Sequence, residues 1–464
     1  MSNQQTVTLQ QEFGRALGEI LTRVSAFAEC RGERAIAIAY SGGLDSSALL
    51  HLAQGWAQEQ GARLFAFHIH HGISLNADDW LAHCAASCTQ QGVQFAARRV
   101  DLAEARKNGT EEAARNARYS ALGALCREHG VELLLTAHHQ DDQAETVLLQ
   151  LLRGSGVAGL SGMDVANAAP DLLAHPTLIM GRPLLGVSRE RLAAFVAAEG
   201  IAYVNDESNA DTRYARNALR HEVMPAIAAL FPGFAGRFAR AAQHAQSAQR
   251  LLVDLAAQDL AGCLDGACIS IPALKLLSDD RMDNVLRYWF GSRGVRMPST
   301  AWLAEMRHQL LDAKADAQLC VAHADCNIRR HRDRIYLTTK HRIDPEEFAP
   351  QTFRWNGDSE IAFPQYGGTL LIEAAAPGIP ADWLREQHLS LGYRSGGERI
   401  KLAQNRPTKS LKHLCQALDI PAWERETLII VRTVAQALYA SGVGMDCHHM
   451  DGDGLLFRWR IDTV

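Results

Sequence analysis

The chain has 464 residues, of which 47% are hydrophobic and 21% are charged, and its formal net charge is −5. This composition is that of a globular protein with room for about three domains, and it excludes collagen-like and intrinsically disordered chains.

We see no signal-peptide segment at the N-terminus and no run of about 18 uncharged apolar residues, so we predict a cytoplasmic protein with no membrane partner. The ten cysteines contain no CxxC pair, which indicates reduced thiols. A metal site at Cys84 and Cys88, which share a helical face, is the less favoured alternative.

Residues 1–230 alternate short apolar runs with Ala- and Leu-rich stretches of helical pattern. The runs are at 35–40, 63–69, 93–100 and 131–137. Strands that alternate with helices predict an α/β domain with a parallel sheet covered on both faces. Ligands of such sheets bind at the carboxyl ends of the strands.

The pattern changes after residue 230. Residues 235–313 are mainly of helical pattern, and 327–339 is a basic strand-like segment. A charged, proline-bearing linker then leads into short strand patterns. We therefore predict three domains: an α/β catalytic domain at 1–230, a mainly helical domain at 231–344, and a linker with a small β-rich α+β domain at 345–464.

Residues 35–51 read AIAIAYSGGLDSSALLH, in which a buried strand leads through two glycines into a helix. Glycines let the backbone approach a ligand, and the N–H groups of a first helical turn bind phosphate. Asp45 would repel phosphate unless a divalent cation joined them, so we predict Mg²⁺ held by Asp45. The lysine of a Walker A loop is absent, and the alternative is a simple connecting turn. The residues predicted to bind ATP are Ser41, Gly42, Gly43, Leu44, Asp45, Ser46 and Ser47.

The string SGGxDS resembles the PP-loop of the ATP pyrophosphatase superfamily, whose members adenylate an oxygen and release pyrophosphate. Further strings narrow the resemblance to the tRNA(Ile)-lysidine synthetase family, in its long form with C-terminal domains. They occur in the family's order and are FHIHHGIS (67–74), GTEEAARNARYSAL (109–122), TAHHQDDQAETVLLQLLRGSGVAGLSGM (136–163), RPLL (182–185) and DESNADTRYARNALRHEVMP (206–225).

This resemblance implies an adenine nucleotide alpha hydrolase-like, Rossmann-like fold in the first domain. It also implies that ATP adenylates the C2 oxygen of the wobble cytidine in the CAU anticodon of isoleucine tRNA. The ε-amine of free L-lysine then displaces AMP, which gives lysidine and changes decoding from AUG to AUA.

Asp142 and Glu145 are spaced i, i+3 on a predicted helix after the strand at 131–137, so both carboxylates lie on one face at the ligand edge of the sheet. Two adjacent carboxylates suit an ammonium group, and the resemblance implies that they hold the incoming lysine. One carboxylate would also help to deprotonate the amine. The alternatives are acids that complement the helix dipole, or Mg²⁺ ligands.

Five histidines end two predicted strands, at 68, 70, 71, 138 and 139, and since side chains alternate along a strand some must point into packing. We predict that His71 contacts ATP and that His139 is catalytic. The resemblance places Arg115 at the catalytic cleft, where a guanidinium stabilises the transferring phosphate. Arg216 matches a family arginine near the active site. For both arginines the alternative is an ordinary helix surface.

Two basic clusters, at 327–342 and 392–414, predict contacts to an RNA backbone, with a solvated surface as the alternative. The second cluster resembles the family's C-terminal domain, which implies binding of the tRNA acceptor stem. The residues selected as RNA-binding are Arg329, Arg330, Arg394, Arg399, Lys401, Arg406, Lys409 and Lys412.

Three other functions compete with this one. A GMP- or NAD-type synthetase would bind no RNA, and a tRNA-thiolating enzyme would need paired cysteines. A non-catalytic nucleotide sensor would not need the carboxylates. The sequence leaves the oligomeric state open, with a homodimer as one alternative.

Overall fold

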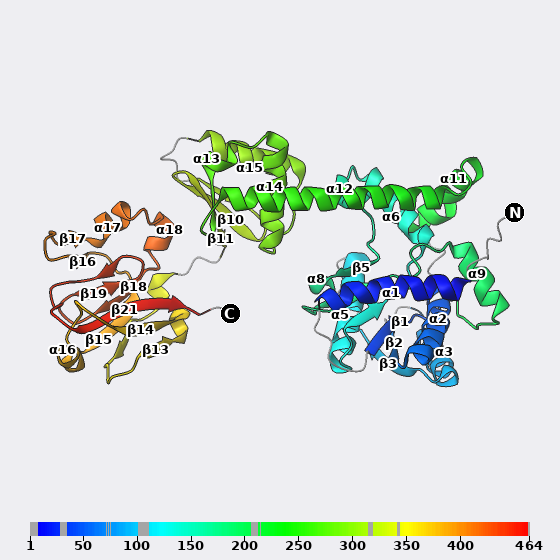
Figure 1. The fold of residues 1–464 in the computed structure, drawn as a ribbon, viewed down its shortest axis with the longest axis horizontal. Coiled ribbons are helices and arrows are strands. Elements are labelled where there is room, and N and C mark those ends of the chain that lie inside the picture. The colour runs from blue at the N-terminus through cyan, green and yellow to red at the C-terminus, as the bar shows by residue number, and fades with distance from the viewer. Residues whose placement is uncertain are drawn as a thin grey trace. The chain divides into compact units, whose positions relative to one another are not determined.

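The computed structural model describes residues 8–27, 35–70, 72, 74, 76–100, 111–205, 212–213, 215–313, 319–340 and 344–462 (Figure 1). The chain forms two compact units, residues 1–255 and residues 256–464.

The first unit is built on a six-stranded sheet of order β3-β2-β1-β4-β6-β5. All neighbouring strands are parallel except β5 and β6, which are antiparallel. The strand order reverses beside β1, and such switch points hold the ligand crevice of open α/β sheets. The parallel sheet predicted for the N-terminal domain is therefore confirmed. The strands are β1 (Ala35–Ala39), β2 (Arg63–His70), β3 (Gln94–Arg99), β4 (Leu133–Leu135), β5 (Ala166–Ala168) and β6 (Ile179–Gly181).

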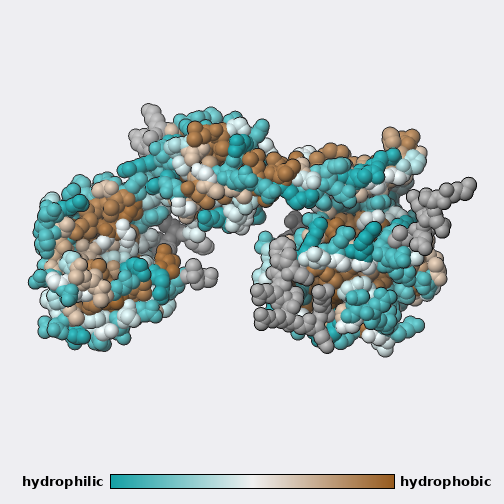
Figure 2. Space-filling model, viewed as in Figure 1, coloured by the Kyte–Doolittle hydropathy of each residue, from teal (hydrophilic) through white to brown (hydrophobic). Residues whose placement is uncertain are grey.

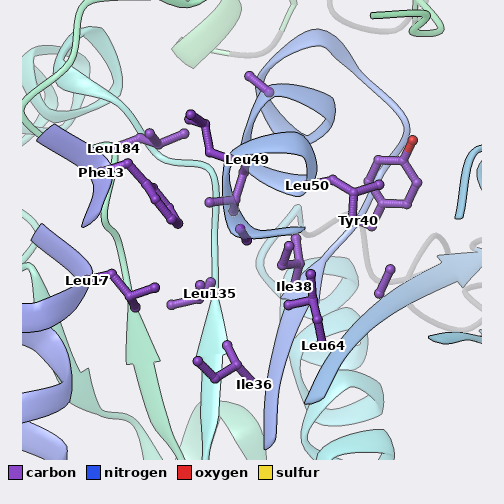
Figure 3. Close-up of a cluster of buried hydrophobic side chains, with 14 of the residues drawn as sticks. Phe13, Leu17, Ile36, Ile38, Tyr40, Leu49, Leu50, Leu64, Leu135 and Leu184 are labelled. Atoms are coloured by element: carbon purple, nitrogen blue, oxygen red, sulfur yellow. The ribbon is translucent and has the colours of Figure 1, made fainter. Parts of the chain in front are cut away.

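Helices cover both faces of this sheet. One face packs against α1 (Leu9–Phe27), α2 (Leu44–Gln60), α3 (Ala77–Gln91) and α9 (Arg189–Ala198). Figure 3 shows this core, in which Phe13 of α1 and Leu49 of α2 lie over the strands. The other face packs against α5 (Glu111–Glu128) and α8 (Pro170–Leu173). Strands buried on both sides read as continuous apolar runs, which is why the sequence reveals them.

The helix α6 (Gln140–Leu152) begins after β4 and organises a smaller core of its own. Leu148 of α6 packs with Leu219, Met224 and Phe234 from the end of the unit. This packing holds the segment after residue 214 against α6. The elements concerned are α7 (Val157–Leu160), α10 (Ala215–Ala218), the π-helical turn η2 (Leu219–Val223), α11 (Met224–Leu230) and α12 (Phe234–Cys263).

The first part of the second unit combines helices with a five-stranded antiparallel sheet of order β7-β8-β11-β10-β9. Trp289 and Phe290 are among its largest buried side chains. The sequence predicted the helices and the basic segment 327–339, which forms the β10–β11 hairpin; the other three strands have only two or three residues and give no periodic signal. The elements are α13 (Ile271–Leu274), α14 (Asp279–Ser292), α15 (Thr300–Asp312), β7 (Leu264–Asp265), β8 (Cys268–Ser270), β9 (Cys320–Ala322), β10 (Cys326–His331) and β11 (Arg334–Thr339).

The rest of the second unit is rich in β-structure, as predicted. It has sheets of order β12-β15-β18-β19-β20, β13-β14-β21 and β16-β17. The elements are β12 (Gln351–Phe353), β13 (Glu360–Phe363), β14 (Gly368–Ala375), α16 (Ala381–Glu386), β15 (Leu389–Tyr393), β16 (Arg399–Ile400), β17 (Lys409–Ser410), α17 (Leu411–Ala417), α18 (Ala422–Arg425), β18 (Ile429–Arg432), β19 (Ala437–Ala440), β20 (Gly444–Met445) and β21 (Gly454–Ile461), with 3₁₀ turns at Pro345–Glu347 and Pro364–Tyr366.

The surface in Figure 2 is largely hydrophilic, with apolar residues in smaller patches. Among the residues that the structure describes, no helix is long and apolar enough to span a membrane.

Candidate functional site

The glycine loop after β1 has a backbone that only glycine allows. Gly42 has φ +81°, in the left-handed region. A Cβ atom there would lie 2.8 Å from Sγ of Cys84 and 3.2 Å from Cγ2 of Val204. The N–H of Val204 donates to the Gly42 carbonyl at 2.9 Å. The loop is therefore held tightly between α3 and the segment that follows α9.

The serines of the loop donate mostly to its own backbone. Oγ of Ser46 donates to the Gly43 carbonyl at 3.0 Å, and Oγ of Ser47 donates to the Gly42 carbonyl at 3.3 Å. Oγ of Ser41 lies 3.0 Å from Oγ of Ser46. The buried Ser46 and Ser47 therefore shape the loop, whereas Ser41 is exposed. α2 begins at Leu44 with no side-chain cap, which leaves its first-turn N–H groups available for an anion.

Asp45, in the first turn of α2, has one carboxylate oxygen without a protein partner. Its Oδ1 is buried and accepts no hydrogen bond, and its Oδ2 lies 3.7 Å from Nε2 of His139. In the described parts of the chain, no group of three or more His, Cys, Asp or Glu side chains could hold a metal ion. A magnesium ion held by one carboxylate together with substrate phosphates needs no such group. The unpartnered Oδ1 therefore fits Mg²⁺.

His139 joins Asp45 to Asp142. It caps α6: its Nδ1 accepts from the Asp142 N–H at 3.4 Å, and Oδ2 of Asp142 accepts from the His139 N–H at 3.0 Å. Its Nε2 lies 3.3 Å from Oδ2 of Asp142. Burial alone would lower the pKa of His139, but the carboxylates of Asp45, Asp142 and Asp141 outweigh it and raise that pKa. An imidazole N–H is thus held between the predicted magnesium carboxylate and the predicted lysine carboxylate.

The other strand-end histidines differ from His139. Desolvation lowers the pKa of His138 to about 3, so this ring is neutral at physiological pH, and its Nδ1 lies 2.8 Å from Oγ1 of Thr136. His68 is buried, with Nδ1 3.0 Å from the Tyr40 carbonyl. The buried His70 has Nε2 3.2 Å from Oδ1 of Asp78. The predicted ATP contact His71 lies outside the described residues.

The two carboxylates predicted to bind lysine lie together and contact two arginines. Nε of Arg216 lies 2.7 Å from Oε2 of Glu145, and its Nη2 lies 3.1 Å from Oδ1 of Asp142. Nε and Nη2 of Arg220 lie 2.6 and 2.9 Å from the two oxygens of Glu145, and Nη2 also lies 3.0 Å from Oδ1 of Asp142. Glu145 is 1% exposed. Desolvation alone would raise the pKa of Asp142, but His139, His138 and Arg216 lower it.

Sequence reasoning missed Arg220. It follows Arg216 by four residues in YARNALRH, so one helical face carries both guanidiniums. That spacing was the signal available. The π-helical turn η2, on which Arg220 lies, is a rare element that is frequent at functional sites. Burial would lower the pKa of Arg220, but hydrogen bonding to Glu145 raises it.

Arg115 lies on α5, away from direct contact with a carboxylate in the described structure. Its side chain is exposed, and its guanidinium lies 4.9 Å from the ring centroid of Tyr119. Arg118 lies 5.8 Å from the same centroid. The charge of Arg115 contributes to the low pKa of His138. Arg115 is therefore within electrostatic range of the site.

Two of the arginines selected as RNA-binding have structural partners instead. Arg330 is buried, and its guanidinium donates to the carbonyls of Leu310, Ala313 and Arg332 at 2.6, 2.8 and 2.8 Å. We therefore remove Arg330 from the predicted RNA-binding set, because the side chain is buried and three of its five donors already bind carbonyls. Nε of Arg329 donates to Oγ1 of Thr338 at 3.2 Å, and its guanidinium lies over a tryptophan ring.

The side chains of the second basic cluster, at 392–414, are more exposed than those of the first. Nε of Arg394 lies 3.7 Å from Oε2 of Glu398, and Lys401 is half-buried. Four other side chains of this cluster are exposed, and in the described structure none pairs with a carboxylate; they are Arg399, Arg406, Lys409 and Lys412. These four remain candidates for contact with an RNA backbone.

Three domain families match this chain. Residues 10–227 match the PP-loop domain, residues 269–336 match the TilS substrate binding domain, and residues 389–459 match the TilS substrate C-terminal domain. Among solved structures, a U34-tRNA thiolase NcsA from Methanococcus maripaludis with its [4Fe-4S] cluster is 17% identical. It covers 50% of this chain and 78% of its own, with a TM-score of 0.41, which is too low to support a functional argument.

Curated relatives are similar along nearly the whole chain. The tRNA(Ile)-lysidine synthase of Burkholderia pseudomallei is 40% identical over 458 residues, with 92% of each chain covered. That of Ralstonia nicotianae is 40% identical over 440 residues, with 91% of each chain covered. This extent of similarity, together with the PP-loop and the acidic site beside it, shows that the chain belongs to the tRNA(Ile)-lysidine synthase family.

Proposed function

We propose that the protein ligates free L-lysine to C2 of the wobble cytidine in the CAU anticodon of isoleucine tRNA, with ATP as the activating substrate. The observation that carries this proposal is the position of Asp142 and Glu145. Both carboxylates are largely buried, and His139 links Asp142 to Asp45 of the PP-loop. An ammonium-binding site thus adjoins an ATP site.

The first step is adenylation. The C2 oxygen of the cytidine attacks the α-phosphorus of ATP; a phosphorus–oxygen bond forms to the base, and the bond to pyrophosphate breaks. The first-turn N–H groups of α2 hold phosphate oxygens, and the exposed Arg115 adds positive charge nearby. Mg²⁺, held by Asp45, would offset the negative charge of the phosphates when it is bound.

The second step transfers the amine. The ε-amine of lysine attacks C2, a carbon–nitrogen bond forms, the C2–oxygen bond breaks, and AMP leaves with the electron pair. The amine must first lose a proton. We propose that Asp142 and Glu145 together hold the ammonium group and that one of the two carboxylates accepts its proton before the attack.

Lysine and the two arginines compete for the same oxygens. Asp142 and Glu145 carry two negative charges, and Arg216 and Arg220 supply two positive charges. These charges cancel, so the lysine ammonium would gain little by binding while both guanidiniums stay in place. We therefore propose that the lysine ammonium replaces one guanidinium on Glu145 or Asp142, and that the released arginine turns to the phosphate of the adenylated base.

The remaining domains would hold the tRNA. We propose the division 1–230, 231–344 and 345–464, with the exposed Arg399, Arg406, Lys409 and Lys412 at the RNA backbone. We propose a cytoplasmic location for the protein, where its tRNA and lysine are present. A homodimer is retained as a proposal to be tested by measuring mass in solution.

The test is incorporation of radiolabelled lysine into acid-precipitable RNA by the full chain with ATP and Mg²⁺. Transcripts of isoleucine tRNA(CAU) and of elongator methionine tRNA are compared, and AMP and pyrophosphate are measured. We expect label on the isoleucine transcript alone, with AMP released in equal amount. If ATP is cleaved but neither transcript is labelled, the PP-loop chemistry is supported and lysine ligation is refuted.

A further inference from the structure

One aspartate in the second unit receives three basic side chains from the β10–β11 hairpin. Nε2 of His331 lies 3.0 Å from Oδ1 of Asp419, and Nε of Arg332 lies 2.7 Å from the same atom. Nη1 of Arg334 lies 3.8 Å from Oδ2 of Asp419. The Asp419 side chain is 29% exposed, so the cluster is open to solvent on one side.

Two turns bring these groups together. Arg332, at the turn between β10 and β11, has φ +50°, and Asp419, after the end of α17, has φ +59°. Residues other than glycine adopt this left-handed backbone infrequently, and aspartate does so more readily than arginine. The Asp419 carboxylate lies at one turn, and the basic groups that contact it lie at or beside the other turn.

A separate contact joins the same segments. Trp423 of α18 has the Arg329 guanidinium 5.2 Å from its ring centroid. The rings of His331 and Tyr336 meet the indole edge-on at 5.9 and 5.4 Å. These contacts do not need Asp419, so the hairpin and α18 have a packed interface besides the ion pairs.

We propose that His331, Arg332 and Arg334 form a binding site for an RNA phosphate, which Asp419 occupies when no RNA is bound. The RNA is the tRNA substrate, and to that extent the inference rests on the proposed function. A phosphodiester presents two anionic oxygens, as a carboxylate does, and arginine binds both kinds of group. Two guanidiniums and an imidazole around one carboxylate therefore form a site that a phosphate fits.

The charges around this cluster favour replacement of the Asp419 carboxylate by an RNA phosphate. Arg334 already pairs with Asp265, with Nη2 of Arg334 2.7 Å from Oδ2. Arg332 is 60% exposed and pairs with Asp419 alone in the described structure. Exposed ion pairs are weak, whereas phosphate contacts on a polyanion gain from release of its counterions. The phosphate therefore displaces Asp419 from Arg332 and His331, while Trp423 keeps the two segments packed.

The main competing explanation is that Asp419 only docks α17 on the hairpin. Equilibrium binding of isoleucine tRNA(CAU) to the full chain, measured over a range of salt concentrations, distinguishes the two. For Asp419→Asn, which keeps the shape and removes the charge, we expect severalfold tighter binding at each salt concentration. For Arg332→Ala we expect severalfold weaker binding and a slope of log affinity against log salt that is shallower by about 0.7 to 0.9.

Matched variants control for general charge effects. Asp382→Asn removes an exposed aspartate that pairs with Arg385, and Arg458→Ala removes an exposed arginine that pairs with Glu373. Both should leave the affinity unchanged. Unchanged or weaker binding by folded Asp419→Asn, or an unchanged salt slope in Arg332→Ala, would overturn the phosphate site, as would a wild-type chain that binds no tRNA.

Lysine incorporation, measured on the same wild-type preparation, separates the two proposals. If the wild-type chain incorporates lysine but Arg332→Ala does not change tRNA binding, the phosphate site is refuted and the proposed function stands. If tRNA binding depends on salt through Arg332 but no lysine is incorporated, the phosphate site stands and the proposed function is refuted.

Discussion

Arg220 and Glu145 form a two-point ion pair, with Nε and Nη2 of the arginine 2.6 and 2.9 Å from the two carboxylate oxygens. Glu145 is almost fully buried, so its charge depends on these partners. The same carboxylate is the one that we assign to the lysine amine. Without lysine, Arg216 and Arg220 neutralise the two carboxylates that we propose for its ammonium group.

Glu145→Gln tests this assignment. Glutamine keeps the side-chain length but removes the negative charge, which leaves two guanidiniums with only Asp142. We expect the lysine KM to rise at least about tenfold, by analogy with a lost charged hydrogen bond of about 1.5 to 3 kcal/mol. Pyrophosphate release that depends on tRNA should persist, because adenylation precedes the use of lysine. Glu190→Gln, at an exposed position on α9, is the control, and a lysine KM equal to that control would refute the assignment.

Asp45→Asn tests the proposed magnesium carboxylate. The amide retains the volume of the side chain but binds a divalent cation poorly, so we expect pyrophosphate release to fall at least about a hundredfold at any Mg²⁺ concentration. Thermal unfolding should shift only modestly, because Oδ1 of Asp45 has no protein partner to lose and Oδ2 loses only its contact with Nε2 of His139. The exposed Asp79 on α3 provides the matched Asn variant. Normal ATP cleavage by Asp45→Asn would show that magnesium is held elsewhere.

The raised pKa of His139 predicts how stability depends on pH. A histidine whose pKa is higher in the folded protein binds its proton more tightly when folded. Its contribution to stability is complete below its ordinary pKa of about 6.5 and is lost as pH rises through the raised value. His139→Asn keeps a good helix cap and removes the ionisable ring.

We therefore expect the loss of Tm caused by His139→Asn to be largest near pH 6 and to shrink toward pH 9. The comparison is made by thermal unfolding of both proteins across that range. His308→Asn, at an exposed position on α15, controls for loss of an imidazole. A Tm difference that stays constant from pH 6 to 9 would contradict the role of Asp45 and Asp142 in holding the His139 proton.

The parts of this site that the sequence predicts share a local cause. The run AIAIAY followed by SGG specifies a strand, a turn and a helix within 20 residues, and the i, i+3 spacing of Asp142 and Glu145 places both on one helical face. Each of these patterns is read from neighbouring residues. The packed parallel sheet follows from the same short-range repetition of strands and helices.

The parts that it does not predict depend on tertiary contacts. Arg220 reaches Glu145 because Leu219 and Met224 pack on α6, a contact between segments about 70 residues apart. The basic run at 327–334 has the composition of an RNA-binding surface, yet the alternation of β10 buries Arg330. Arg332 is exposed because it lies in the turn between β10 and β11. Composition cannot separate these two, since both belong to one cluster.

Arg330 and Lys409 should therefore differ when each is replaced by alanine. Arg330→Ala removes the donor to three carbonyls, and unsatisfied buried polar groups cost about 1 to 3 kcal/mol each. We expect its free energy of unfolding in urea to fall by at least about 2 kcal/mol, with the salt slope of tRNA binding unchanged in the folded fraction. Lys409→Ala, at an exposed site, should keep its stability within about 0.5 kcal/mol and make the salt slope shallower by about 0.7 to 0.9. The opposite pattern, with Arg330→Ala stable and impaired only in RNA binding, would mean that this guanidinium leaves its carbonyls to meet a phosphate.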